Sequence, residues 1–350
     1  MTLCRHFLTC GGCAHQDIPD ADYRTLKRRQ VLDALARHGI ETDVEDPVEV
    51  PPGTRRRTVL KAKKGEGAVL GFHAARSHDI VDIMECRVLT PALAAILPGL
   101  RAMMAALLSP GEDAELRLTE SDSGLDLGLR WKKPNDPPTL AALSRWAGKL
   151  GLIRISAHGE TVVSLAKPMV RLGKAEVALP PEPFLQPTRP GEAALQEFVC
   201  RTLKGAKRVA DLFCGCGTLS FPLAEQARVH AVEIEAAMLE ALAAAAKATP
   251  GLKPVSTEKR NLFRRPLNET ELNTYDAVSL DPPRAGALEQ ARMLARSKLA
   301  RIAYVSCDAE SFARDARILI DGGFTLKRVV PVDQFLWSSQ IELAGEFAWE

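Results

Sequence analysis

The spacing of hydrophobic residues changes along the chain, and each pattern predicts a different kind of structure. Between Asp20 and Ile40, apolar residues recur at helical intervals among charged ones, which predicts an amphipathic helix. From about Val44 to Val177, short β-branched runs are broken by Gly, Pro and Asp, with one helical stretch near Pro91 to Leu108. This second pattern predicts a smaller, mostly antiparallel α+β domain.

A proline-rich segment separates this region from a third pattern. Residues 180–190 contain five prolines in eleven positions, and after them predicted strands and helices alternate to the end of the chain. The predicted strands include 208–213, 229–234, 325–332 and 341–348. Such alternation predicts a doubly wound α/β domain, in which ligands bind at the carboxyl ends of the parallel strands.

These patterns divide the 350 residues into four expected parts. Residues 1–15 form a cysteine-rich loop, and residues 16–43 form a helix that is expected to pack on the C-terminal α/β domain. Residues 44–180 form the central α+β domain, and residues 184–350 form the α/β domain. A chain of this length is long enough for two domains with separate hydrophobic cores.

The composition is that of an ordinary globular protein. Hydrophobic residues make up 46% of the chain and charged residues 26%, which excludes long disorder and collagen-like repeats. No stretch approaches the ~18 uninterrupted apolar residues of a membrane span, and the first residues lack the order of a secretory signal. We therefore expect a cytoplasmic protein whose eight cysteines are reduced and serve metal binding or catalysis.

The positive charges are unevenly distributed, although the net charge is only +2. Residues 55–64 carry six basic residues and no acidic one. Such a patch can hold the phosphates of a nucleic acid while the rest of the surface stays neutral, and a solvated basic face is the alternative. The candidate phosphate contacts in this patch are Arg55, Arg56, Arg57 and Lys61.

A glycine-rich turn, DLFCGCG, follows the first strand of the α/β domain. Gly215 and Gly217 let the backbone turn tightly against a ligand. Glu233 ends the second strand, where a carboxylate can accept hydrogen bonds from ribose hydroxyls. Ser220 takes the place of the third glycine of a dinucleotide fingerprint, so the turn is similar instead to the S-adenosylmethionine site of class I methyltransferases. The cofactor residues implied are Asp211, Phe213, Gly215, Gly217 and Glu233.

Two further strand ends carry groups suited to catalysis. The sequence VSLDPPRAG places Asp281 at the ligand edge, where Arg284 can meet a phosphate or steady the carboxylate. Cys307 ends the next strand at the same edge, although a cysteine taken alone is often a small buried apolar residue. Asn261, after the third strand, is expected either to face an adenine or to cap a local turn.

Together these motifs resemble the RNA uracil-5-methyltransferase family, whose members make 5-methyluridine from S-adenosylmethionine. The matching segments are FLQ at 184–186, DLFCGCG at 211–217, DPPR at 281–284, YVSC at 304–307 and ARD at 313–315. The resemblance covers nearly the whole chain and implies a class I, Rossmann-like methyltransferase domain. It implies that Cys307 is the nucleophile, that Asp281 and Gln186 hold the target base or cofactor, and that Glu342 accepts a proton.

The chemistry of uracil explains why residues of these types are needed. C5 of the ring is a poor nucleophile, and a thiolate that adds to C6 pushes electron density onto C5, which can then take a methyl group. The product then forms when a base removes the C5 proton and the thiol leaves. Cys307 and Glu342 are the expected nucleophile and base.

The chain departs from the family pattern near both of these residues. Asp308 and Ala309 stand where the family usually has Asn-Pro after the catalytic cysteine, and Gln340 stands where it often has His. A carboxylate next to the thiol is expected to raise the thiol pKa. These departures concern the catalytic rate more than the type of reaction.

The cysteines near the N-terminus are spaced as C-x5-C-x2-C, formed by Cys4, Cys10 and Cys13, and Cys86 is the expected fourth ligand. Four thiolates suit a [4Fe–4S] cluster, and they also suit zinc. The spacing does not decide between the two metals. The family resemblance favours the iron–sulfur cluster, because part of the family carries one with this three-plus-one arrangement.

The resemblance also indicates a class of substrate. The cluster-bearing branch acts mainly on large-subunit ribosomal RNA, which favours 23S rRNA over the alternative, transfer RNA. A non-catalytic iron–sulfur RNA-binding or assembly factor is a further alternative, suggested by Asp308, Ala309 and Gln340. We expect a monomer that acts on structured RNA, with no membrane association and no obligate protein partner.

Overall fold

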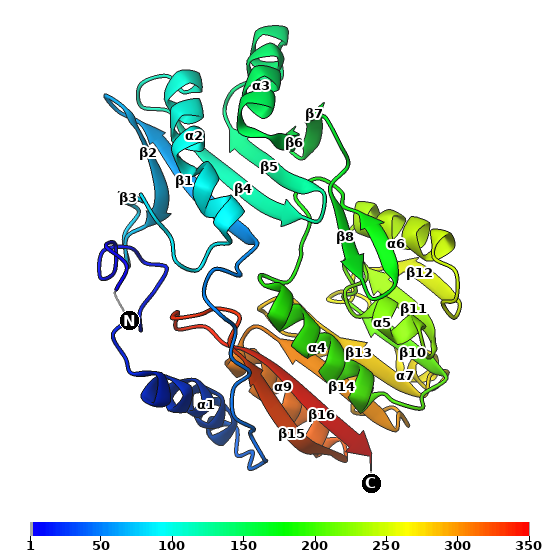
Figure 1. Ribbon diagram of the computed structural model, residues 1–350. Helices are drawn as coiled ribbons and strands as arrows, with labels where there is room; N and C mark the ends of the chain where they lie inside the picture. The colour runs from blue at the N-terminus through cyan, green and yellow to red at the C-terminus, as the bar shows by residue number, and fades with distance from the viewer. Residues whose placement is uncertain (1–2, 350) are drawn as a thin grey trace.

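Two seven-stranded sheets form the framework of the protein, one in each half (Figure 1). The computed structural model describes residues 3–349. The N-terminal sheet has the order β3-β2-β1-β4-β5-β6-β7, and its neighbouring strands are antiparallel except for β5 and β6. Its strands are β1 (Arg57–Lys64), β2 (Ala68–His73), β3 (Ile80–Asp82), β4 (Asp113–Ser121), β5 (Gly124–Trp131), β6 (Leu152–Ala157) and β7 (Glu160–Ser164).

Two helices bury their apolar residues against one face of this sheet (Figure 1). The helix α2 (Pro91–Leu107) lies where the sequence predicts a helix. The helix α3 (Pro137–Leu150) was not predicted. It connects β5 to β6, and a parallel pair of strands requires such a crossover, whereas an antiparallel pair needs only a short turn. The central domain is therefore mostly antiparallel, with one parallel pair.

The C-terminal sheet has the order β12-β11-β10-β13-β14-β16-β15. Its strands are β10 (Arg208–Leu212), β11 (Arg228–Glu233), β12 (Val255–Lys259), β13 (Ala277–Leu280), β14 (Arg301–Ser306), β15 (Phe324–Val332) and β16 (Glu342–Trp349). The first five strands in this order are parallel, and β16 runs antiparallel to both of its neighbours. This arrangement confirms the predicted α/β fold class.

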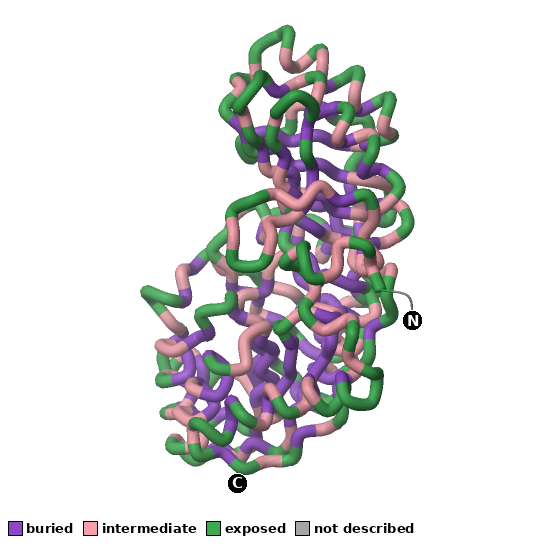
Figure 2. Tube along the Cα trace, turned by 90° about the vertical axis from the view of Figure 1, so that its left-hand side faces the viewer, coloured by how far each residue is buried: buried purple, intermediate pink, exposed green. Residues whose placement is uncertain are grey.

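Helices cover both faces of the C-terminal sheet. One face packs against α4 (Arg189–Thr202), α5 (Ser220–Ala224) and α6 (Ala236–Ala248). The other packs against α1 (Asp20–Arg37), α7 (Glu269–Leu272), α8 (Leu288–Leu294) and α9 (Ala309–Asp321). Figure 2 shows buried segments running through both halves of the molecule, and the N-terminal half has an apolar core of its own.

Segments on both sides of the central sheet pack on the C-terminal half. Val44 and Val48 form isolated bridges with β15, so the chain follows this edge strand before it enters the central sheet. The hairpin of β8 (Met169–Leu172) and β9 (Ala175–Ala178) packs on α6. The compact central sheet thus lies inside the predicted range 44–180, and the flanking stretches of that range contact the α/β half.

Buried polar residues fasten α1 to the loop between β15 and β16. The ammonium of Lys27, which is fully buried, lies 3.0 Å from Asp333 Oδ1 and donates to the carbonyl oxygens of Ser338 and Gln340. The hydroxyl of Tyr23 donates to Asp333 Oδ2 at 2.6 Å.

None of the helices within residues 3–349 has the length and apolar character that a membrane crossing requires.

Candidate active site

A cavity of about 550 Å³ opens where the parallel strands of the C-terminal sheet end. The turns after β10, β11, β12, β13 and β14 line it from the sheet. The strand β1 of the central domain also lines it, together with Phe184, Gln186 and Pro187 from the segment before α4. Most of the predicted site residues line it: Gln186, Asp211, Phe213, Gly215, Glu233, Asn261, Asp281, Arg284, Cys307 and Glu342. Residues of four of the five sequence motifs, which are distant along the chain, therefore meet in one pocket, and the ARD motif at 313–315 does not line it.

The glycine-rich turn adopts a conformation that its glycines allow. Gly215 and Gly217 have φ angles of +54° and +98°, and a Cβ on Gly217 would lie 2.6 Å from the ring of Phe221. The amide of Gly215 donates to Glu233 Oε2 at 3.0 Å, and Oε1 accepts from the amide of Ile234. The carboxylate of Glu233 is thus fixed against the turn at the edge of the pocket.

Asp211 lies at the carboxyl end of β10, buried beneath the turn. Its Oδ2 accepts a hydrogen bond from the hydroxyl of Ser220. Burial raises the pKa of Asp211 to about 7, and the negative charge of Glu233 adds to this effect, while hydrogen bonds from Ser220 and Ser279 oppose it. Asp211 therefore gains a proton far more readily than an exposed carboxylate does.

Two aromatic rings form part of the cavity wall. The rings of Phe213 and Phe263 lie 5.4 Å apart, and 46% of Phe263 is exposed. The sequence analysis did not identify Phe263 or Ile234, which also lines the cavity with an exposed side chain. Asn261 Oδ1 accepts from the amides of Phe263 and Arg264, so its carboxamide oxygen caps the local turn.

A chain of hydrogen bonds joins the two carboxylates on the catalytic side of the pocket. Gln186 Nε2 donates to Asp281 Oδ2 at 2.8 Å. Gln334 Nε2 donates to Gln186 Oε1 at 2.7 Å and to Glu342 Oε2 at 2.8 Å. Burial raises the pKa of both carboxyl groups, to about 7 for Asp281. Like charge raises both further: the charge of Asp211 acts on Asp281, and the charge of Asp281 acts on Glu342. Gln334 was not predicted from the sequence.

Cys307 is half-buried at the end of β14, in the same cavity. Burial raises the pKa of its thiol to about 12. Neighbouring carboxylates add to this shift, in the order Glu342, Asp281 and Asp308. The expected effect of Asp308 on the thiol is thus present, but it is smaller than that of burial. The thiol is therefore protonated at neutral pH.

The residues that depart from the family pattern have identifiable positions. Asp308 is the N-cap of α9, where its side chain accepts from the amide of Ser311 at 2.9 Å. It also lies 3.1 Å from Arg284 Nε. Ala309 is the first residue of α9. Gln340 is exposed and gives its backbone oxygen to Lys27.

The basic residues of β1 and the segment before it have different surroundings. Arg55 and Arg57 line the cavity, and the guanidinium of Arg57 lies 4.8 Å from the ring of Phe184. Arg56 is 2% exposed and forms a buried ion pair with Glu192, with a distance of 2.5 Å between Nη2 and Oε2. Lys61 pairs with Glu115 on the neighbouring strand, outside the cavity. The structure therefore brings Arg55 and Arg57 to the site, and it leaves Arg56 and Lys61 elsewhere.

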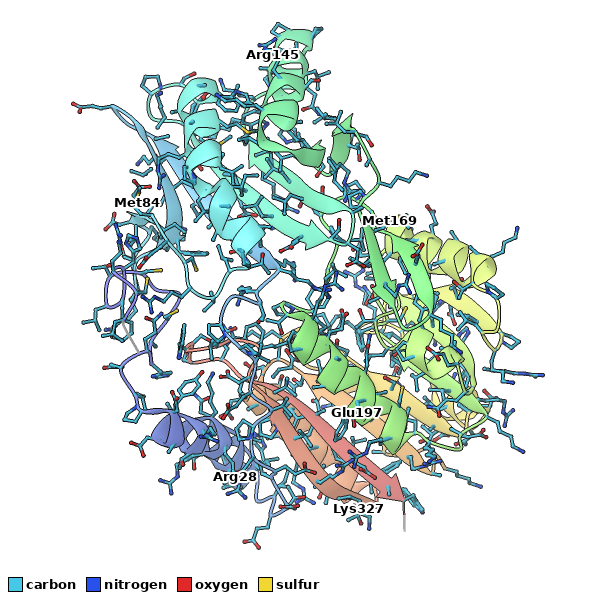
Figure 3. All side chains as sticks on the ribbon, viewed as in Figure 1. Arg28, Met84, Arg145, Met169, Glu197 and Lys327 are labelled. Carbon is cyan, nitrogen blue, oxygen red and sulfur yellow. The ribbon has the colours of Figure 1, made fainter. Side chains whose placement is uncertain are left out.

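The four predicted metal ligands line a second cavity, of about 380 Å³, beside the first. They are Cys4, Cys10, Cys13 and Cys86. In Figure 3 sulfur atoms gather beside the N-terminal loop, below the label of Met84. Both cavities share Arg55, Thr58, Val59 and Phe335, which form the wall between them.

The cysteine pocket has some features of a thiolate site. The amide of Gly12 lies 3.5 Å from Cys10 Sγ, and the thiols are not engaged in disulfides. Burial raises the pKa of Cys10, Cys13 and Cys86, to about 11 for Cys86. Within residues 3–349, no three His, Cys, Asp or Glu side chains converge closely enough to hold a single metal ion.

Comparisons with known proteins agree with this geometry. A family model described as tRNA (Uracil-5-)-methyltransferase matches residues 176–347. An RNA methyltransferase from Caulobacter vibrioides is 45% identical over 98% of this chain and 85% of its own length. The 23S rRNA (uracil(1939)-C(5))-methyltransferase RlmD from Salmonella choleraesuis is 33% identical over 97% of this chain and 80% of its own length.

The fold has a solved counterpart as well. The crystal structure of the Pyrococcus abyssi tRNA (uracil-54, C5)-methyltransferase, in complex with S-adenosyl-L-homocysteine, superposes with a TM-score of 0.76. The match covers 97% of this chain and 86% of that structure at 22% identity. The resemblance seen in the sequence motifs is therefore confirmed over the full chain, which belongs to the RNA uracil-5-methyltransferase family of enzymes.

Proposed function

We propose that this protein transfers a methyl group from S-adenosylmethionine to C5 of a specific uridine in structured ribosomal RNA, through a covalent bond between Cys307 and C6 of the base. The observation that carries the proposal is the composition of the larger cavity. The thiol of Cys307 shares it with the carboxylates of Asp281 and Glu342, and with a glycine-rich turn backed by Glu233.

The cofactor would be held by the part of the cavity next to β10 and β11. Glu233 presents a fixed carboxylate to the ribose hydroxyls, and the small Gly215 lets a ligand approach the backbone. Phe263 and Ile234 offer exposed apolar surface for an adenine ring. When bound, S-adenosylmethionine supplies an electrophilic methyl group.

The chain's own residues would carry the remaining steps. The sulfur of Cys307 bonds to C6 while the thiol proton passes to water, and the electrons of the C5–C6 double bond shift toward the C4 carbonyl oxygen. Burial makes ionisation of the thiol costly unless it is coupled to this addition. C5 becomes nucleophilic and accepts the methyl group. The ionised Glu342 then removes the C5 proton, and the thiolate leaves C6 as the double bond re-forms.

Recognition of the target base is assigned to the amide and carboxyl groups opposite the thiol. Gln186 and Asp281 are joined by a hydrogen bond and can present donors and acceptors to the edge of a uracil. The base must leave its stack to reach the cavity, at a cost of a few kcal/mol that is lowest in an RNA loop. Arg55, Arg57 and Arg284 lie at the cavity to meet the neighbouring phosphates.

The second cavity is proposed to hold a [4Fe–4S] cluster bound by its four cysteines. Four sulfur donors and an amide directed at one of them suit such a cluster. The four thiols share one cavity, and the family resemblance favours a four-iron cluster there over a zinc ion. The cluster would join the N-terminal loop to the central domain and shape the RNA surface.

The cluster can be tested by anaerobic reconstitution with iron and sulfide. We expect about four irons per chain and a brown protein that absorbs visible light, and loss of both in Cys13→Ser. Cys200→Ser is the matched control, because Cys200 is half-buried in α4 and lies outside the cavity. Stoichiometric zinc in place of iron would support the alternative metal.

The choice of RNA rests on the relative named for 23S rRNA, whereas the family model and the archaeal structure carry transfer-RNA names. Mapping of 5-methyluridine in ribosomal and transfer RNA from cells that lack this protein decides between them. We expect one ribosomal site to be lost. Loss confined to transfer RNA would assign the protein to that substrate.

Methyl transfer itself is tested with purified protein, S-adenosylmethionine and RNA from the same deletion strain. Wild-type protein is expected to methylate this RNA, and Cys307→Ala is expected to be inactive. Turnover by Cys307→Ala would exclude the covalent mechanism. A wild-type protein that binds RNA and cofactor without any turnover would instead be a binding or assembly factor. We further propose that the enzyme acts in the cytoplasm as a monomer.

A further inference from the structure

Gln334 is a buried amide that touches the catalytic machinery without lining the cavity. It follows β15, is 1% exposed and donates both of its side-chain hydrogens. One goes to Gln186 Oε1 at 2.7 Å and the other to Glu342 Oε2 at 2.8 Å. We propose that Gln334 is a positioning residue. It orients both Glu342, the group that accepts the C5 proton, and the side-chain amide of Gln186, which contacts the target uracil. This inference rests on the proposed function.

The hydrogen bond to Gln186 determines which way that amide faces. An amide oxygen accepts and an amide nitrogen donates, so a Gln186 turned by 180° would place its NH2 group against that of Gln334. With its oxygen held by Gln334, Gln186 directs its nitrogen to Asp281 at 2.8 Å. Gln334 thus specifies the pattern of donors and acceptors that the target base meets.

The hydrogen bond to Glu342 acts on the charge of the base. Burial and the charge of Asp281 raise the pKa of Glu342, and the hydrogen bond from Gln334 opposes this rise. Without the donor, Glu342 stays protonated to a higher pH and cannot accept the C5 proton there. The removal of the proton should then shift to higher pH.

The surroundings of Gln334 leave it little freedom to move. Gly191 on α4 lies directly against it, and a Cβ at position 191 would come within 2.6 Å of Gln334 Oε1 and 2.9 Å of its Cβ. The preceding residue, Asp333, is held by Tyr23 and Lys27. The amide is therefore fixed from α4 on one side and from α1 on the other.

The test compares Gln334→Met with Gln290→Met. Methionine keeps the length of the side chain and removes the hydrogen bonds. Gln290 is also 1% exposed and makes two hydrogen bonds, both to the backbone of Leu267, away from the cavity. Both variants lose a buried amide, so general destabilisation should appear in both. Effects on the protonation of Glu342 should appear only in Gln334→Met.

We expect Gln334→Met to slow product release roughly tenfold to hundredfold, as a lost hydrogen bond to a charged group implies. The covalent adduct between Cys307 and RNA, detected on denaturing gels, should accumulate. In the pH profile of the single-turnover rate, the limb on the acidic side should move to higher pH. Gln290→Met should leave this limb in place. An unmoved limb and unchanged adduct lifetime in Gln334→Met would overturn the inference.

Alkylation of Cys307 by iodoacetamide gives a readout that needs no RNA. The charge of Glu342 raises the thiol pKa, so a Glu342 that is more protonated should let the thiol react faster at a fixed pH. We expect faster alkylation in Gln334→Met, and also in Gly191→Ala, which displaces the amide without removing it. Equal rates in all proteins would overturn the inference, whereas wild-type protein that methylates no RNA would count against the proposed function alone.

Discussion

Arg284 Nε lies 3.1 Å from the carboxylate of Asp308, the residue that follows the proposed nucleophile Cys307. The same carboxylate caps α9 through the amide of Ser311. Asp308 is therefore held by a cation and by a backbone amide, and its charge still raises the pKa of the thiol. An asparagine at this position could serve as the cap but could not form the ion pair.

Asp308→Asn is expected to make Cys307 more reactive. The substitution keeps the helix cap and removes one of the negative charges that hold the thiol pKa high, so alkylation at pH 8 should become faster, on the order of threefold to tenfold. The measurement is the rate of iodoacetamide labelling of the Cys307 peptide by mass spectrometry. Arg284→Met is the complementary variant, because it leaves the carboxylate unpaired and should slow labelling. Identical rates in both variants would show that the ion pair does not act on the thiol.

Glu342→Gln is expected to separate the early steps from product release. In the proposed mechanism, addition to C6 and methyl transfer precede proton removal, so this variant should accumulate a protein–RNA adduct that survives denaturing gels. Cys307→Ala should form none. The carboxamide keeps the size of the side chain and can still accept from Gln334. A fully active Glu342→Gln protein without adduct would assign the base to another group, with Asp308 next to be tested.

Asp211 makes the free protein less stable at higher pH. Its pKa in the folded state is about 7, against an ordinary value of 3.8, so the folded state binds its proton more tightly than the unfolded state does. The stabilisation is fully present below about pH 4 and is lost as the pH rises through 7, with an upper limit on the order of 4 kcal/mol. Asp211→Asn should therefore raise the melting temperature at pH 8 relative to wild type, and much less at pH 5.

The control for this pH dependence is Asp22→Asn, which removes an exposed carboxylate from α1. It should shift the melting curves at pH 5 and pH 8 by similar small amounts. A parallel offset for Asp211→Asn at both pH values would contradict the assignment of a raised pKa to this residue.

Arg56 is expected to stabilise the fold instead of binding RNA. Arg56→Met leaves the buried carboxylate of Glu192 without its partner, at a cost of roughly 3–5 kcal/mol in the free energy of unfolding. Urea denaturation should show this loss, and much of it should be recovered in the double variant with Glu192→Leu. Arg57→Met should weaken RNA binding instead. Equal effects of both single variants on RNA affinity at unchanged stability would contradict this division.

The sequence motifs predicted which residues meet in the cavity, but the hydrophobic and charge patterns did not predict the contacts that surround them. Cys307, Asp281 and Glu233 could be placed because each ends a parallel strand, and such ends share one edge of a sheet. Gln334 could not be found in this way, since it follows an edge strand and reaches the site only because β15 and β16 pair antiparallel. The charge pattern of residues 55–64 likewise did not reveal that Arg56 points toward a carboxylate on α4.

The helix α3 was missed for a related reason. Its sequence lies between β-branched runs in a region that read as antiparallel, and nothing local shows that β5 and β6 run parallel. The parallel pairing of β5 with β6, a long-range contact, required a helix between them. Pro137 and the N-cap Asp136 were the local signals of a helix start.

The contact of Tyr23 with Asp333 spans 310 residues and has a consequence for synthesis on the ribosome. At roughly 5–20 residues per second, α1 leaves the ribosome about 15–60 s before its binding loop does. During this interval the apolar residues of α1 that will pack on the C-terminal sheet have no partner, whereas the strands of the central sheet, between residues 57 and 164, are already complete. The nascent chain is thus expected to fold from its middle outward, and its first helix to dock last.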